Sequence, residues 1–166
     1  TVDSQYNHPA RNAKSILTTG SITVKPARSA QNFDRALTVK GFTLGAAVSG
    51  LTIGSAGTSA ATQTASAITM EQSTSIAGPI AVYGGDVTNS TNLTATTANG
   101  SIAINANGTF TNSAAISSAA GNQPTTIKAE KAALTGSINS GTGVTQITGF
   151  NAARTNDLGL AGDTTS

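Results

Sequence analysis

The side chains that could carry acid–base or metal chemistry are few and widely spaced in this chain. Seven carboxylates occur, and no two are neighbours in the sequence: Asp3, Asp34, Glu71, Asp86, Glu130, Asp157 and Asp163. General acid–base catalysis needs two carboxylates brought together, or a histidine with a partner, and the single histidine, His8, stands alone in a polar segment. The sequence therefore predicts no catalytic residue, no metal site and no cofactor, and we interpret the chain as a non-enzyme.

Asp86 is the one carboxylate beside a well-formed strand pattern, and two roles are open to it. A coiled chain can stack distant aspartates into a site that cleaves acidic polysaccharides, but one aspartate that follows two glycines is typical of a turn cap. Here Asp86 follows Gly84 and Gly85. We expect a structural role at a corner of the chain.

Four asparagines lie in the Asn-x-Ser/Thr pattern that accepts N-linked sugars. They are Asn89, Asn92, Asn99 and Asn107. A chain rich in Asn and Thr produces this pattern by chance, so the four positions are candidates for glycosylation and no more.

The composition favours a narrow β-structured core. Ala, Ser, Thr and Gly make up 92 of the 166 residues, and only 10% of the residues are charged. Thr, Val and Ile suit a pleated surface, while small residues let backbones approach closely. The absence of cysteine excludes disulfide scaffolds and thiolate metal sites, and no apolar run is long enough for a membrane span. A start at Thr1 without a leader pattern indicates a processed chain or a piece of a longer one.

Six of the nine basic residues fall in the first quarter of the chain: Arg11, Lys14, Lys25, Arg28, Arg35 and Lys40. Such a cluster can attract polyanions, but these cations are dispersed and no aromatic residues are interleaved with them as a stacking platform. We interpret the segment as a solvated surface and expect no nucleic-acid partner.

Apolar doublets of period two recur along the chain, mostly at a spacing of about 22 to 25 residues, which is in the range of solenoid repeats. They are Leu51/Ile53, Ile80/Val82, Ile102/Ile104 and Ile127/Ala129, with single apolar positions at Ile76, Leu93, Ile116 and Ile138 and a third set at Met70, Val87, Phe110 and Leu134. Three short strands per repeat, separated by Gly, Asn and Asp corners that tolerate positive φ, are typical of a triangular β-solenoid. We expect the core to hold Ile80, Val82, Ile102, Ile104, Phe110 and Ile116.

Two alternatives remain open at this level. Asn99-Gly100 and Asn107-Gly108 are also hairpin signals, so an antiparallel β-sandwich fits the same alternation. The segment Ile127–Leu134 contains good helix formers, although it fits a solenoid strand equally well. Along the chain we expect an irregular, basic segment at 1–35 with one strand at Ser15–Lys25, a solenoid at 36–150 that starts with a strand at Ala36–Leu44, and an irregular tail at 151–166.

Residues 51–110 resemble the repeat region of secreted bacterial adhesins of the filamentous haemagglutinin type. The resemblance lies in Leu51-Thr-Ile-Gly-Ser-Ala-Gly, in Gly78-Pro-Ile-Ala-Val-Tyr-Gly-Gly-Asp-Val, in Asn92-Leu-Thr and in Gly100-Ser-Ile-Ala-Ile-Asn-Ala. It covers roughly a third of the chain, and residues 1–45 do not share it. The resemblance implies a right-handed parallel β-helix, export by a two-partner system, and service as a long stalk for attachment.

The leading hypothesis is a structural and adhesive segment of an exported bacterial surface fibre, located outside the cell or on its surface. Its partner would be a receptor or a glycan on a host or environmental surface, and self-association is open. The rival hypothesis is a self-assembling, pilus-like filament subunit that polymerises through its amino-terminal strand, because a small-residue β-chain of this length has the size of such subunits.

Overall fold

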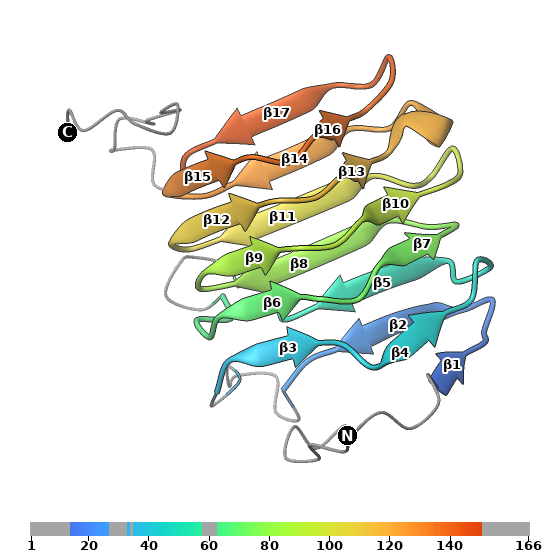
Figure 1. The fold of residues 1–166 in the computed structure, drawn as a ribbon, viewed down its shortest axis with the longest axis horizontal. Coiled ribbons are helices and arrows are strands. Elements are labelled where there is room, and N and C mark those ends of the chain that lie inside the picture. Colours follow the sequence, from blue (N-terminus) through green and yellow to red (C-terminus); the bar gives the residue numbers. More distant parts are fainter. Residues whose placement is uncertain (1–13, 27–32, 34, 58–62, 151–166) are drawn as a thin grey trace.

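The chain winds into a stack of β-coils in the computed structural model, which describes residues 14–26, 33, 35–57 and 63–150 (Figure 1). All the strand pairs within these residues are parallel. The predicted all-β parallel β-helix is therefore confirmed. The alternative antiparallel sandwich is wrong, because its hairpins would pair neighbouring strands in opposite directions.

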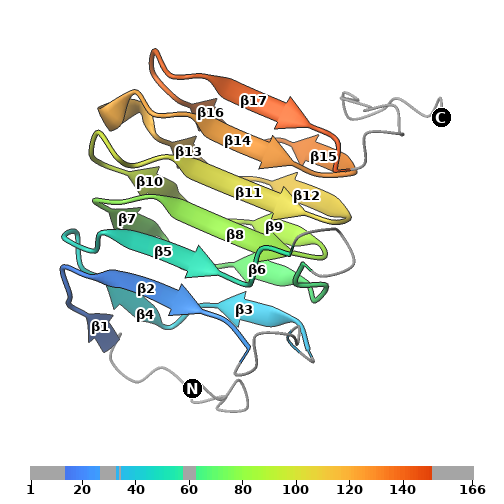
Figure 2. The ribbon, with the colours of Figure 1, turned by 180° about the vertical axis from the view of Figure 1, so that it is seen from behind.

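Three faces of parallel strands enclose one interior. One face is a six-stranded sheet of β2 (Ser21–Val24), β5 (Gly50–Ile53), β8 (Ile80–Gly84), β11 (Ile102–Ala106), β14 (Thr125–Lys128) and β17 (Thr145–Thr148), seen from its own side in Figure 2. The second is a five-stranded sheet of β3 (Leu37–Val39), β6 (Ile68–Met70), β9 (Val87–Asn89), β12 (Thr109–Asn112) and β15 (Lys131–Leu134).

The third face is shorter and is formed by two sheets. The larger sheet has four strands: β7 (Thr74–Ile76), β10 (Leu93–Ala95), β13 (Ile116–Ser117) and β16 (Ile138–Asn139). The smaller sheet is the pair of β1 (Lys14–Ile16) and β4 (Phe42–Leu44), which lies below the larger sheet with β4 against β7. A single turn of 3₁₀-helix, η1 (Ala119–Gly121), occupies the corner between β13 and β14. Within the described residues, no helix is long and apolar enough to cross a membrane.

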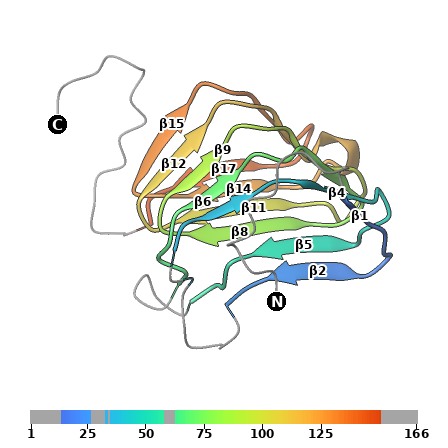
Figure 3. The same cartoon turned by 60° about the horizontal axis from the view of Figure 1, so that its bottom comes forward.

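Each coil contributes one strand to each face in turn, so β8, β9 and β10 lie under β11, β12 and β13 (Figure 1), and Figure 3 shows the same stack with its bottom turned forward. Ile80 pairs with Ile102, and Ile102 pairs with Thr125, so these two coils have lengths within the expected range. The two earlier coils are longer than expected, because Ile22 pairs with Leu51 and Leu51 pairs with Ile80.

The solenoid begins earlier in the chain than the predicted boundary at residue 36. Strand β2 pairs in register with β5, and β1 pairs with β4, so the basic amino-terminal segment contributes two strands to the stack. The strand expected at Ala36–Leu44 is two strands, β3 and β4, which meet at a corner where Gly41 has a φ of 79°. Residues 1–13 and the tail expected at 151–166 lie outside the described residues.

The interior is lined as expected on all three faces. The six residues predicted to fill it are buried, each at most 1% exposed: Ile80, Val82, Ile102, Ile104, Phe110 and Ile116. Ile127–Leu134 forms no helix; it is the end of β14, a corner, and β15. Toward the carboxyl end the interior becomes more polar, because Thr125 continues the column of Ile80 and Ile102 and its hydroxyl lies 2.9 Å from that of buried Ser118.

The register differs from the predicted one by two positions in several places. Ile104 pairs with Ile127 and not with Ala129, and Met70 pairs with Asn89 and not with Val87. A strand shifted by two keeps the same side chains facing inward, so alternation alone does not distinguish the two registers. Only the lengths of the corners distinguish the two registers, and these lengths vary from coil to coil.

The predicted glycine corners are in place, but most of them do not depend on positive φ. Gly141, between β16 and β17, has a φ of 62°. Gly85, between β8 and β9, has no positive φ, yet a Cβ there would lie 2.0 Å from the carbonyl oxygen of Ala65. At this corner the absence of a side chain serves close approach of two backbones.

Candidate functional site

The carboxylates of the described chain do not converge. Glu71, Asp86 and Glu130 belong to three different coils, and within the described residues no group of three His, Cys, Asp or Glu side chains is placed to hold a metal ion. Asp3, His8, Asp34, Asp157 and Asp163 lie outside the described residues.

Asp86 caps a corner of the next coil. Its Oδ1 accepts a hydrogen bond of 2.7 Å from the backbone N–H of Thr109, and a Cβ on Gly108 would lie 2.4 Å from the same oxygen. The aspartate and the glycine therefore form one device that joins two coils, and the structural role predicted for Asp86 is confirmed. Asn122 makes the same kind of contact at the corner between β13 and β14, where its Oδ1 accepts a hydrogen bond of 2.9 Å from the backbone N–H of Thr142 in the next coil.

An Asp86→Ala variant is expected to unfold with about 1 kcal/mol less free energy than the wild type, because the Thr109 N–H loses its acceptor at an exposed corner. Asp86→Asn keeps a side-chain carbonyl in the same place and should lose less than half of that. Urea denaturation followed by circular dichroism measures both. An Asn variant as unstable as the Ala variant would show that the hydrogen bond is not the source of the effect.

A second device recurs at the corner that follows the five-stranded sheet. The hydroxyl groups of Ser90, Ser113 and Thr135 donate to the carbonyl oxygens of Met70, Asn89 and Asn112 at 3.0, 3.3 and 3.2 Å. In each case the backbone N–H of the same residue donates to the same oxygen. These hydroxyls thus donate within the stack, so only their acceptor lone pairs are left for a partner.

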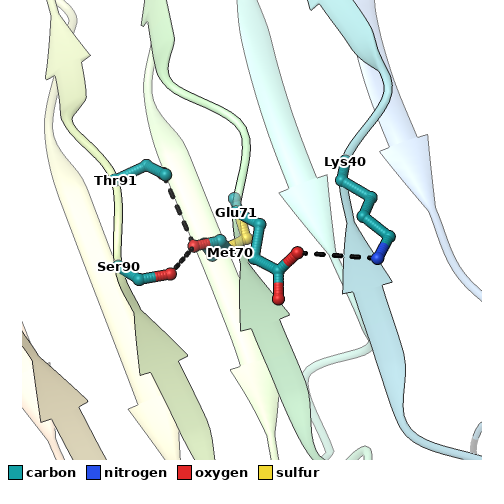
Figure 4. Close-up of polar contacts among 5 residues, drawn as sticks. All are labelled: Lys40, Met70, Glu71, Ser90 and Thr91. Atoms are coloured by element: carbon teal, nitrogen blue, oxygen red, sulfur yellow. Dashed lines mark hydrogen bonds and ion pairs between the residues drawn. The ribbon is translucent and has the colours of Figure 1, made fainter. Parts of the chain in front are cut away.

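In the earlier coils, the residues that follow the strands of the five-stranded sheet are Lys40 and Glu71, and they form an ion pair. Figure 4 shows Ser90 and Thr91 on the carbonyl oxygen of Met70, and beside them Lys40 Nζ at 3.7 Å from Glu71 Oε2. The Lys40 and Glu71 side chains are 63% and 44% exposed, so solvent screens the pair and it contributes little to stability. The other described cations of the amino-terminal quarter, Lys14, Lys25 and Arg35, are exposed.

The outward side of the five-stranded sheet carries a column of threonines on four of its strands, and Ala133 takes the equivalent place on the fifth strand, β15. Thr38, Thr69, Thr88 and Thr111 occupy equivalent positions on β3, β6, β9 and β12, each at the outward place between two inward residues. Within the described part of the chain, no intramolecular hydrogen bond engages their hydroxyl groups. We call these four residues the threonine column; they are the most regular set of free hydrogen-bonding groups on the described surface.

The outward columns of the other two faces are less regular. On the six-stranded sheet the equivalent column reads Thr23, Thr52, Ala81, Ala103, Thr126 and Gln146. On the third face it includes Ser75, Thr94, Ser117 and Asn139. The threonine column is therefore the best candidate for a binding surface.

The candidate glycosylation sites fall into different environments. Asn89 is fully buried and its side chain points into the core, so a sugar cannot be attached there in the folded protein; this candidate is wrong. Asn92 is exposed, but its Oδ1 accepts from the N–H of Ala115 at 3.3 Å. Asn107 is half-buried, and Asn99 is exposed.

Asn89 belongs to a buried pair that the sequence analysis missed. Its Nδ2 donates to Oδ1 of Asn112 at 2.7 Å, and Nδ2 of Asn112 donates to the carbonyl oxygen of Ala114 at 2.9 Å. Both asparagines are 0% exposed, and Oδ1 of Asn89 has no hydrogen-bond partner. A signal was present, because the tripeptide Thr-Asn-Ser occurs at 88–90 and again at 111–113.

That repeated tripeptide explains three columns at once. Its threonine faces outward in the threonine column, its asparagine faces inward in the buried pair, and its serine ties the corner to the preceding coil. The spacing between its two copies is one full coil, since β9 pairs in register with β12.

Comparison of the chain with family models, with curated proteins and with solved structures gives no match, so the fold and these columns are what inform the function.

Proposed function

We propose that this chain is a stiff segment of an exported bacterial surface fibre that mediates attachment, and that the threonine column is its contact surface. The observation that supports the proposal most is the column of four free hydroxyls on successive strands of an in-register sheet. The resemblance of residues 51–110 to adhesins of the filamentous haemagglutinin type points in the same direction, toward a location on the cell surface or outside the cell.

The mechanism of such a segment is geometric. Adjacent strands in a parallel ladder lie about 4.8 Å apart, so each coil lengthens the rod by that amount and fixes the next hydroxyl at the same interval. The ladders on three faces resist bending together, since a bend must stretch backbone hydrogen bonds on at least one face. A polar partner rich in hydroxyl groups, such as a glycan, would meet donors and acceptors already held in place, which lowers the entropy lost on binding.

The triple variant Thr69→Val, Thr88→Val, Thr111→Val tests the proposal. Valine keeps the shape and the β-propensity of threonine but removes the hydroxyl. Each lost hydrogen bond to the partner is worth about 0.5–1.5 kcal/mol, so we expect retention on immobilised glycans and on epithelial cells to fall by about tenfold or more. The matched control is Thr23→Val, Thr52→Val, Thr126→Val on the six-stranded sheet, which should leave retention unchanged.

Two results would contradict the proposal. Equal retention of the two triple variants would remove the threonine column as the contact surface. Failure of the wild-type chain to be retained on any neutral glycan, acidic glycan or cell surface would remove the adhesive role altogether.

The second candidate function is a self-assembling filament subunit, and exposed apolar side chains near both ends of the described stack favour it. Ile16 and Leu17 are 40% and 80% exposed beside the first coil, and Val144 is 67% exposed beside the last. A native mass in multiples of the 16.3 kDa chain that falls to one chain in denaturant would support this function. A concentration-independent single-chain mass would contradict it.

A further inference from the structure

We propose that Asn99 is a site of spontaneous deamidation in the folded protein, and that the otherwise matched Asn107 is protected from it. The two asparagines lie at opposite ends of β11, in nearly identical local sequences, Ala98-Asn99-Gly100-Ser101 and Ala106-Asn107-Gly108-Thr109. Any difference in their rates therefore reports on the fold and not on the neighbouring residues.

An asparagine that precedes glycine is chemically exposed to attack by its own backbone. The backbone nitrogen of Gly100, after loss of its proton to solvent base, forms a bond to Cγ of Asn99. The bond from Cγ to Nδ2 then breaks, and Nδ2 takes a proton and leaves as ammonia. Water opens the resulting five-membered succinimide at either carbonyl, which gives aspartate or isoaspartate. Glycine permits this because it has no Cβ to hinder its nitrogen and because its backbone rotates freely.

The environment of Asn99 allows the required movement. Residues 96–99 form a continuously exposed corner between β10 and β11, and no hydrogen bond engages the Asn99 side chain within the described structure. The N–H of Gly100 donates only to the carbonyl oxygen of Thr97 in the same turn, at 2.9 Å. Gly100 is buried, and the Thr97 hydroxyl donates to the carbonyl oxygen of Ala77 in the preceding coil. The Gly100 N–H itself makes no hydrogen bond to another coil, so freeing its nitrogen requires only a local opening of the turn, which costs far less than global unfolding.

The environment of Asn107 prevents the same movement. The N–H groups of Asn107 and Gly108 donate to the carbonyl oxygens of Gly84 and Gly85 in the preceding coil, at 3.0 and 2.8 Å. The next residue, Thr109, is held by Asp86 at 2.7 Å. Freeing the Gly108 nitrogen therefore requires the separation of two coils, and Asn107 is itself half-buried.

The consequence is a surface charge that changes with the age of the protein. Conversion of Asn99 lowers the formal net charge of the chain by one from its value of +2. The new carboxylate stands on an exposed corner outside the strands, so the stack of coils remains intact. This inference does not depend on the proposed adhesive function.

Incubation of the full chain at mildly alkaline pH, natively and in guanidinium chloride, tests the proposal. A chymotryptic digest with tandem mass spectrometry separates the two sites and detects the small gain of mass at each. In the native protein we expect Asn99 to convert at least about ten times faster than Asn107, and in guanidinium chloride we expect the two rates to converge. The Asn99→Gln variant should lose the fast conversion and keep the slow one, because glutamine would have to form a larger ring.

Two results would overturn the proposal. Native rates that differ by less than about threefold would show that the corner between β11 and β12 gives no protection. An Asn99 that stays intact in the native protein, while both sites convert in guanidinium chloride, would show that the turn closed by Thr97 is as well protected as the ladder.

Discussion

An Ile102→Asp variant is expected to lose at least about 4 kcal/mol of unfolding free energy, a large part of the whole stability of a domain. Ile102 is 1% exposed and lies in the six-stranded sheet between Ile80 of the coil below and Thr125 of the coil above. The substitution removes a buried apolar side chain and replaces it with a carboxylate, and none of these neighbours can pair with the charge. The variant must therefore protonate, hydrate the core or open the coil.

The matched control is Ala103→Asp on the same strand. Ala103 faces outward between Ala81 and Thr126, so a carboxylate there remains in water. We expect the melting temperature to fall by at least about 10 °C for Ile102→Asp and by no more than a few degrees for the control, as measured by circular dichroism. An unchanged melting temperature for Ile102→Asp would contradict the inward register of β11.

The recurrence of apolar doublets was sufficient to predict the fold class. Ile80/Val82 and Ile102/Ile104 lie in register as expected, and the corners fall at the Gly and Asn dipeptides between them. This succeeded because a coil must return to the same place after each repeat, so inward side chains recur at the length of one coil.

The register of the remaining columns was not predictable in this way. A coil with a longer or shorter corner shifts its strands by two positions, and the alternation looks the same after the shift. A match of apolar residues to apolar residues places Met70 beside Val87, whereas the partner of Met70 in the structure is Asn89. The assumption that a column has one chemical character fails at the buried asparagines and at Thr125.

The candidate contact surface was hidden for a related reason. Within single segments of the chain the pattern Thr-x-Thr occurs only in isolated cases such as Thr94-Ala-Thr96, whereas the threonine column runs across strands. Its members Thr69, Thr88 and Thr111 lie in three successive coils, at unequal intervals in the sequence, and become neighbours only once the register is known. Features that run along the axis of a solenoid are therefore read from the coil length, and not from local sequence patterns.

The second large effect concerns the buried pair of Asn89 and Asn112: each single substitution should lower the free energy of unfolding, whereas the double substitution should leave it nearly unchanged. Asn112→Leu removes the Oδ1 that accepts from Asn89, and so leaves a buried amide without a partner on either of its polar atoms. Asn89→Leu leaves Oδ1 of Asn112 without its donor. A buried polar group without a hydrogen bond costs about 1–3 kcal/mol, so each single variant should lose roughly that much unfolding free energy.

The double variant Asn89→Leu, Asn112→Leu removes both asparagines at once. The carbonyl oxygen of Ala114 also loses its donor, but Ala114 is half-buried, so water can replace that donor. It continues an inward column that already holds Val39 and Met70 below the pair and Leu134 above it. Leucine branches at the same atom as asparagine, and replacement of both partners by apolar groups of similar shape is close to neutral. We expect the double variant to lie within about 1 kcal/mol of the wild type in urea denaturation, although the two single losses would add to several times that value.

The double-mutant cycle therefore decides what the pair does. A coupling energy near zero would mean that the two asparagines do not depend on each other, in conflict with the 2.7 Å hydrogen bond between them. A large coupling with a stable double variant would mean that the pair adds no net stability. In that case the benefit of the pair is that it fixes the register of adjacent coils. If a strand with the repeat Thr-Asn-Ser slipped by two positions, its asparagine would lie against an apolar neighbour and would have no hydrogen-bond partner. The pair would therefore hold adjacent coils in the alignment that keeps the threonine column in register.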